Sequence, residues 1–269
     1  MTPVQRAVSH LALLTLAAPR AEAQQVNGDR VRYELGRVTV MFQAGAFSPE
    51  EMGRFAVLAD RGVQDIDTLL NHVGPGARMG PPITFVVRDG IPMSRSFRRT
   101  VMLPAERVRR DTAPYLHEAT HVLVPMKEEC LWISEGFASY VQSYVAEKIG
   151  GYDGYVFSWG GNGNIDRLAR RTLNSDLGRA ALPYVGGAGE PAEIFEKRRE
   201  VAQPLYILAH SLVKFMVEGT NLDKVKALVE ARDIPGSAKG ITGRTIDEWK
   251  ADWLAMLSAP RTEVVTRRP

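Results

Sequence analysis

Apolar and polar residues follow two different periods along this chain. A period of two is typical of strands with one buried face, and it occurs over residues 30–42, 83–87 and 100–103. A recurrence every three or four residues is typical of helices, and it occurs over residues 48–70, 134–148, 204–217, 222–231 and 245–257. Strands that come early and helices that come late predict an α+β fold with a small N-terminal sheet and a mostly helical C-terminal lobe. The cleft between these two lobes would be the natural place for an active site.

Short polar signatures mark where several of these helices begin. Residues 48–51 (SPEE) and 245–248 (TIDE) are capping boxes, in which a hydroxyl residue is followed three positions later by an acid. Another helix is expected from Thr112, with Thr112 as its cap and Pro114 in its first turn. These signatures predict helix starts independently of the apolar pattern.

The first 23 residues differ in kind from the rest of the chain. Arg6 gives a positive start, residues 7–18 are mostly apolar, and Ala21-Glu22-Ala23 is a small-x-small exit. This order is typical of a secretory signal peptide, and the alternative is a buried N-terminal helix. We therefore expect residues 1–23 to be a signal peptide, removed near Ala23, and the mature protein to be periplasmic or extracellular.

Composition adds mainly exclusions to this picture. Hydrophobic residues make up 45% of the 269 positions and charged residues 24%, which is typical of a globular protein with a sizeable core. A formal charge of +3 does not indicate a nucleic-acid partner. No segment after the first twenty residues approaches the ~20 apolar residues of a transmembrane helix. Cys130 is the only cysteine, so no internal disulfide forms, and it is a soft ligand, a reactive thiol or a small buried side chain.

The chemistry-bearing segment is YLHEATH at residues 115–121. His117 and His121 are four residues apart, so on a helix they lie on one face and both imidazoles can reach a single ion. Glu118 lies beside them, and its carboxylate can reach a water bound to that ion. This H-E-x-x-H arrangement supplies two zinc ligands and a general base.

A third ligand is available a short distance along the chain. A catalytic zinc site normally has three protein ligands and one position open for water. Residues 132–140 read WISEGFASY, and Glu135 follows His121 after thirteen intervening residues. That length lets one helix end and a second helix return antiparallel to it. The two segments together resemble the gluzincin zinc metallopeptidases, which include relatives of thermolysin and aminopeptidase N and the bacterial peptidase-MA-like group.

This resemblance implies a zincin-like catalytic domain that hydrolyses peptide bonds in a peptide or protein substrate. One Zn²⁺ would be held by His117, His121 and Glu135, and Glu118 would act as the general base toward a metal-activated water. Within this domain, residues 24–111 would form an N-terminal strand and helix subdomain. Residues 112–260 would supply the zinc-binding helices and the helical C-terminal lobe.

Several supporting groups are candidates with open alternatives. Tyr206 and His210, one turn apart on one helix, are candidate donors to the oxyanion of the reaction. For Tyr206 the alternative is core packing with its hydroxyl at the surface. Ser139 is either a partner that orients a ligand or a plain helix serine.

The resemblance is weaker outside the two ligand segments. The strand at residues 100–103 is similar to the edge strand that holds extended substrate in these enzymes. Residues 206–216 and 249–257 are similar to helices of the peptidase-MA-like group. The spacing between His121 and Glu135 is shorter than in thermolysin or aminopeptidase N. No Gly-x-Met-Glu-Asn motif precedes the metal helix, so the sequence does not support exopeptidase action.

Other functions remain compatible with the same residues. One is a non-catalytic zinc-binding envelope protein that uses a peptidase-like fold for binding or scaffolding. Another is a zinc hydrolase acting on an amide or ester other than a peptide. A cluster of arginines before the metal helix indicates either an acidic partner or a solvated rim: Arg95, Arg98, Arg99, Arg107, Arg109 and Arg110. The sequence does not indicate the natural substrate or the oligomeric state.

Overall fold

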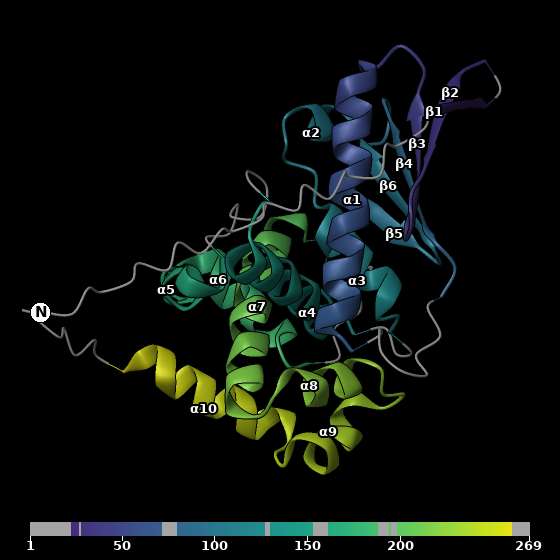
Figure 1. The fold of residues 1–269 in the computed structure, drawn as a ribbon. Coiled ribbons are helices and arrows are strands. Elements are labelled where there is room, and N and C mark those ends of the chain that lie inside the picture. Colours follow the sequence, from purple (N-terminus) through teal and green to yellow (C-terminus); the bar gives the residue numbers. More distant parts are fainter. Residues whose placement is uncertain are drawn as a thin grey trace, which may run out of the picture.

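A computed structural model describes residues 23–26, 28–71, 80–126, 130–152, 161–187, 194 and 198–259. Its first half is built around a sheet and its second half consists of helices, as Figure 1 shows. The predicted α+β architecture, with an N-terminal sheet and a mostly helical C-terminal lobe, is confirmed. Apart from Ala23, the predicted signal peptide lies outside the described residues, and the predicted division at residues 111 and 112 stays a prediction.

The described strands form one mixed, six-stranded sheet in the order β1-β2-β3-β4-β6-β5. Their bounds are β1 Ala23–Val26, β2 Arg30–Glu34, β3 Val38–Gln43, β4 Ile83–Arg88, β5 Arg95–Phe97 and β6 Thr100–Pro104. The β3–β4 and β4–β6 pairs are parallel and the other pairs are antiparallel. The strand at residues 100–103 was expected at the sheet edge, and this is wrong, because β5 pairs with it on its outer side.

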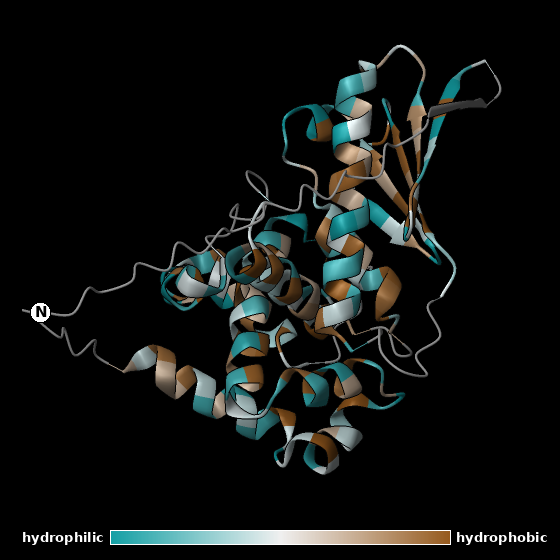
Figure 2. Ribbon diagram, viewed as in Figure 1, coloured by the Kyte–Doolittle hydropathy of each residue, from teal (hydrophilic) through white to brown (hydrophobic). Residues whose placement is uncertain are grey.

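One face of the sheet forms a core with helix α1 (Pro49–Leu69), which connects β3 to its parallel neighbour β4 (Figure 1). The alternating inward residues of the three central strands are fully buried: Val38, Val40, Phe42, Ile83, Phe85, Val87, Val101 and Leu103. The predicted capping box of α1 is present, with Ser48 and Glu51 bonding each other's backbone. Figure 2 shows hydrophobic residues in the middle strands and hydrophilic residues along β2.

The helical part is assembled around α7. Its elements are α2 Ala105–Arg109, α3 Tyr115–Leu123, α4 Leu131–Tyr144, α5 Gly161–Leu173, α6 Asp176–Ala181, α7 Ala202–Gly219, α8 Leu222–Val229, α9 Ile234–Thr242 and α10 Ile246–Ser258. A π-helical turn, Val145–Ile149, extends α4, and short 3₁₀ turns lie at Leu182–Tyr184 and Arg199–Val201. Helix α7 packs against α4, α5, α6, α8 and α10. None of the described helices combines enough length and apolar character to cross a membrane.

Several helix boundaries differ from the expectation. Helix α3 begins at Tyr115 with Pro114 at its cap position, so Thr112 is not its cap. The Thr112 hydroxyl instead donates to the carbonyl of Arg107. Helix α4 begins at Leu131, before the expected Ser134, because the buried residues at its start continue the helical core. The helices α5, α6 and α9 were not expected.

Candidate metal centre

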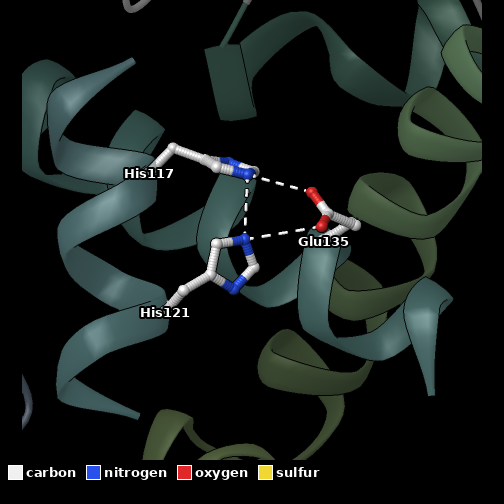
Figure 3. A group of neighbouring side chains, drawn as sticks. All are labelled: His117, His121 and Glu135. Carbon is white, nitrogen blue, oxygen red and sulfur yellow. Dashed lines mark hydrogen bonds and ion pairs between the residues drawn. The ribbon is translucent and has the colours of Figure 1, made fainter. Parts of the chain in front are cut away.

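Helix α3 carries three of the predicted site residues and is held tightly in place. It packs against α1, α4 and the strands β5 and β6. The approach to α1 is close, because a Cβ atom on Gly62 would lie 2.4 Å from a methyl of Leu116. One face of α3 is therefore fixed in the core, and His117 and His121 project together from another part of its surface (Figure 3).

Helix α4 carries the third ligand and is fixed by its contact with α7. Nearly all of α4 is buried, and Glu135 is one of its two partly exposed positions. The next residue is a glycine for a steric reason, since a Cβ on Gly136 would lie 2.6 Å from the Ala209 carbonyl oxygen. The close contact of the two backbones sets how far α4 lies from α7 at the position of Glu135.

The three predicted ligands converge on one point (Figure 3). His117 Nε2 lies 2.9 Å from Glu135 Oε2, and His121 Nε2 lies 3.1 Å from His117 Nε2. His121 Nε2 and Glu135 Oε1 are 3.5 Å apart. The side chains of His117, His121 and Glu135 are 13%, 17% and 16% exposed, respectively, so the cluster is enclosed but solvent reaches it.

These distances fit a tetrahedral zinc site. Zinc binds histidine nitrogen and carboxylate oxygen at about 2.0–2.2 Å, so tetrahedral ligand atoms lie roughly 3.3 Å from one another. The two Nε2 atoms lie 3.1 Å apart and His117 Nε2 lies 2.9 Å from Glu135 Oε2, both near this value. His121 Nε2 lies 3.5 Å from the other carboxylate oxygen, Oε1. Two imidazole nitrogens and a carboxylate also present converging lone pairs, an arrangement that a cation stabilises. The residues present therefore fit a zinc ion, and three protein ligands leave the fourth position of a tetrahedral site to water.

The second ring nitrogen of each histidine lies beside a serine hydroxyl. Ser134 Oγ lies 3.1 Å from His121 Nδ1, and Ser139 Oγ lies 3.4 Å from His117 Nδ1. When Nδ1–H donates to an oxygen, Nε2 keeps a free lone pair directed at the metal position. Ser139 therefore lies where an orienting partner would. Ser134 was missed by the sequence reasoning, although it directly precedes Glu135 in the same helix turn.

Glu118 is buried on the same helix, with 7% of its surface exposed. Burial raises the pKa of Glu118, and Glu135 acts in the same direction, while His117 and His121 oppose this shift. The Ser96 side chain of β5 also lies near Glu118 and lowers its pKa. No feature of the sequence identified Ser96, because a three-residue strand gives too little alternation to place its side chain.

The electrostatics of the cluster hold Glu135 ionised. Burial would raise the pKa of Glu135, but the adjacent His121 and His117 imidazoles hold it well below its usual range. Burial would likewise lower the pKa of His121, and the Glu135 carboxylate outweighs this and raises it. A carboxylate that stays charged is the form that binds a cation.

The two predicted oxyanion donors lie on α7. His210 is buried, and its Nε2 lies 2.7 Å from Asn162 Oδ1, while its Nδ1 has no hydrogen-bond partner among the described residues. Asn162 Nδ2 donates to the Tyr140 carbonyl, which directs Oδ1 toward His210 and requires a proton on His210 Nε2. Burial lowers the pKa of His210 to about 3. Tyr206 is half-buried in the first turns of α7. The donor roles of both residues stay predictions.

Cys130 and the described surface hollow both lie outside the cluster of ligands. Cys130 is buried at the N-terminal end of α4 and is not one of the three clustered residues. A surface hollow of about 270 Å³ lies elsewhere, along β3 and β4 from Met41 to Asp89. The predicted substrate cleft between the lobes stays a prediction, although α3 contacts the sheet on one side and α4 contacts α7 on the other.

Comparison with known proteins gives distant structural similarity. No protein-family model and no curated protein matches this sequence. One similar solved structure is an M1 zinc metallopeptidase mutant from Deinococcus radiodurans, with 16% identity and a TM-score of 0.46 over 90% of this chain and 52% of that one. Another is a two-domain M1 zinc metallopeptidase mutant bound to L-arginine, with 18% identity and a TM-score of 0.43 over 90% and 51%.

The chain spans about half the length of these solved structures. Among the described residues, His117, His121 and Glu135 are the group of potential ligands whose atoms all lie within 4.8 Å of one another. They form a candidate metal centre, and the chemistry of their donor atoms suits zinc.

Proposed function

We propose that this protein is a zinc-dependent hydrolase of peptide bonds, with His117, His121 and Glu135 as ligands of one ion. The observation that carries the proposal is the convergence of three ligand atoms within 4.8 Å, with a buried carboxylate on the same helix. A binding or scaffolding site has no need for an acid at the position of Glu118. The peptide as substrate is suggested by the resemblance to gluzincin metallopeptidases and by the likeness to M1 zinc metallopeptidases.

Each residue of the site has a distinct part in the proposed reaction. A zinc ion bound there would supply a polarised water of lowered pKa and an electrophile for the substrate carbonyl. Glu118 accepts the proton of the attacking water and passes it to the leaving amine. Burial raises the pKa of Glu118, which strengthens it as the acceptor of that proton. Ser134 and Ser139 orient the two imidazoles, and Tyr206 donates to the developing oxyanion. His210 takes this part only if its Nε2–H leaves Asn162, because its other ring nitrogen carries no proton.

The test separates metal binding from catalysis. The purified protein should contain one zinc ion and should cleave members of a broad peptide library, and a chelator should abolish the cleavage. Glu118→Gln should retain zinc but cleave about 100- to 10,000-fold more slowly, because a general base contributes a rate enhancement of that size. His117→Ala and Glu135→Ala should lose the metal itself. Glu106→Gln, on the exposed surface of α2, is the matched control and should change neither property.

Two results would contradict the proposal. Cleavage that persists in zinc-loaded Glu118→Gln protein would show that Glu118 is not the base. Zinc binding without chelator-sensitive cleavage of any peptide would favour a non-catalytic zinc protein of the cell envelope. Export remains a prediction from the first 23 residues, and the N-terminal sequence of the protein secreted by its own host would test it.

A further inference from the structure

The strand β5 lies at the outer side of the sheet and beside the candidate metal centre. Among the described strands its neighbour is β6, so the backbone groups on its other side face no described strand. Helix α3, which carries His117 and His121, packs against β5. The Ser96 side chain in the middle of this strand lies near enough to Glu118 to lower the pKa of that carboxyl group. The outermost described strand therefore lies beside the proposed base.

The pairing of β5 with β6 shows which face of the sheet each side chain of β5 lies on. Ser96 is paired with Val101, which is fully buried beneath the helices, so Ser96 faces α3. Arg95 and Phe97 are paired with Met102 and Thr100 and lie on the opposite face. Phe97 is 69% exposed, which makes it the most exposed large hydrophobic side chain among the described residues.

The positive charges near β5 differ in whether they are neutralised. Arg109 and Arg110, farther along the chain, both form ion pairs with Glu106. Arg95 is exposed and forms no ion pair with any residue that the structure describes. Arg98 lies with its guanidinium 5.3 Å from the ring of Phe97, again without a carboxylate partner in the described chain. The exposed Phe97 ring thus lies beside the Arg98 guanidinium and on the same strand face as Arg95, and neither arginine pairs with a carboxylate of the described residues.

An extended peptide substrate along the outer strand of the sheet is what the resemblance to gluzincins implies, and β5 is the described strand in that place. We propose that Arg95 selects an acidic side chain in the peptide segment that lies along β5. This inference rests on the proposed function for the reaction but concerns which peptides are taken. In an added strand, the residue opposite Arg95 has its Cβ roughly 5 Å from that of Arg95 and lies on the same face. A carboxylate there reaches the guanidinium, whereas a lysine is repelled.

The same geometry predicts a two-residue pattern in the substrate. Side chains alternate between the faces of an added strand, so the residue two positions from the acid lies opposite Phe97. A large apolar side chain at that position covers the exposed ring. The residue between them lies opposite Ser96 and faces α3 and Glu118. The preferred segment is therefore acidic–x–apolar, in the order set by the direction of the peptide.

The first experiment measures cleavage preference. A peptide library carries Glu, Gln or Lys at one position and Leu or Ser two positions away, in both orders. We expect about threefold faster cleavage for Glu than for Gln and about tenfold faster than for Lys, as for an opposed charge pair on a strand. Arg95→Glu should reverse the preference to Lys, and Phe97→Ser should remove the preference for Leu. Arg110→Glu, also an exposed arginine, is the control and should keep the original preference. Unchanged charge preference in Arg95→Glu overturns the proposal.

The second experiment does not depend on cleavage. A fluorescent peptide with the Glu-x-Leu pattern and its Lys-x-Leu counterpart are titrated against zinc-loaded Glu118→Gln protein, with and without Arg95→Glu, at low and high salt. The proposal for Arg95 is supported if the protein binds Glu-x-Leu more tightly, if Arg95→Glu reverses this preference, and if high salt weakens the binding. This holds even if no peptide is cleaved, in which case only the proposed peptidase activity is contradicted. Cleavage of peptides without any charge preference in binding supports the peptidase and overturns the role of Arg95.

Discussion

Replacing Gly136 with alanine is the most direct test of how the metal centre is built. A Cβ at this position would lie 2.6 Å from the carbonyl oxygen of Ala209, 2.8 Å from the carbonyl carbon and 2.8 Å from a methyl of Val213. Two of these atoms belong to the backbone of α7 and cannot move by a side-chain rotation. The helices α4 and α7 must therefore separate, and Glu135 moves with α4.

The size of the effect follows from two opposing terms. Alanine favours a helix interior over glycine by about 1 kcal/mol. Overpacking a close contact costs about 1–3 kcal/mol, and a backbone clash lies toward the upper end of this range. We expect Gly136→Ala to lower the free energy of unfolding by about 1–2 kcal/mol in total. Displacement of a ligand by tenths of an ångström should also weaken zinc binding by about tenfold.

A matched control isolates the packing term. Gly53 lies inside helix α1, and a Cβ added there meets no atom within 4 Å. Gly53→Ala should therefore raise the free energy of unfolding by about 0.5–1 kcal/mol. Urea unfolding of both metal-free variants, followed by circular dichroism, gives the difference, and zinc affinity is measured by competition with a chromogenic chelator. If Gly136→Ala is as stable as Gly53→Ala and binds zinc equally well, the close packing of α4 on α7 is wrong.

Two further predictions concern the polar groups around the site. Ser134→Ala should weaken zinc binding by about tenfold, because His121 loses the partner that orients its ring, and Ser139→Ala should have a smaller effect. Competition with a chelator measures the zinc affinity of both variants. If both bind zinc as tightly as the unaltered protein, the serines do not orient the histidines. Because burial lowers the pKa of His210 to about 3, this side chain stays neutral in the fold while the unfolded chain protonates at its ordinary value. Its stabilising contribution is complete above pH 6.5 and is lost as pH falls toward 3, by up to about 1.4 kcal/mol per pH unit. Urea unfolding between pH 4.5 and 7 should show a flatter dependence in His210→Gln, and identical slopes would contradict the prediction.

Much of the secondary structure can be predicted from the sequence, because the interactions that determine it are between residues close in the chain. The capping boxes at residues 48–51 and 245–248 form as expected, since each involves groups three residues apart. The strands β3, β4 and β6 follow the alternation of their own residues. Thr112 failed as a cap because Pro114 lies closer to the first turn of α3. The short strand β5 was missed because three residues carry no readable period.

The sequence by itself determined the ligand types and the His117–His121 pair, because residues four apart on a helix share a face whatever surrounds them. Only the tertiary structure decided that Glu135 lies within reach of both imidazoles, since its position depends on the packing of α4 on α7. It also decided that Ser96 lies near Glu118 and that Arg95 lies on the outermost of the described strands. These juxtapositions join segments distant in sequence, and no local period of the chain encodes which of them meet.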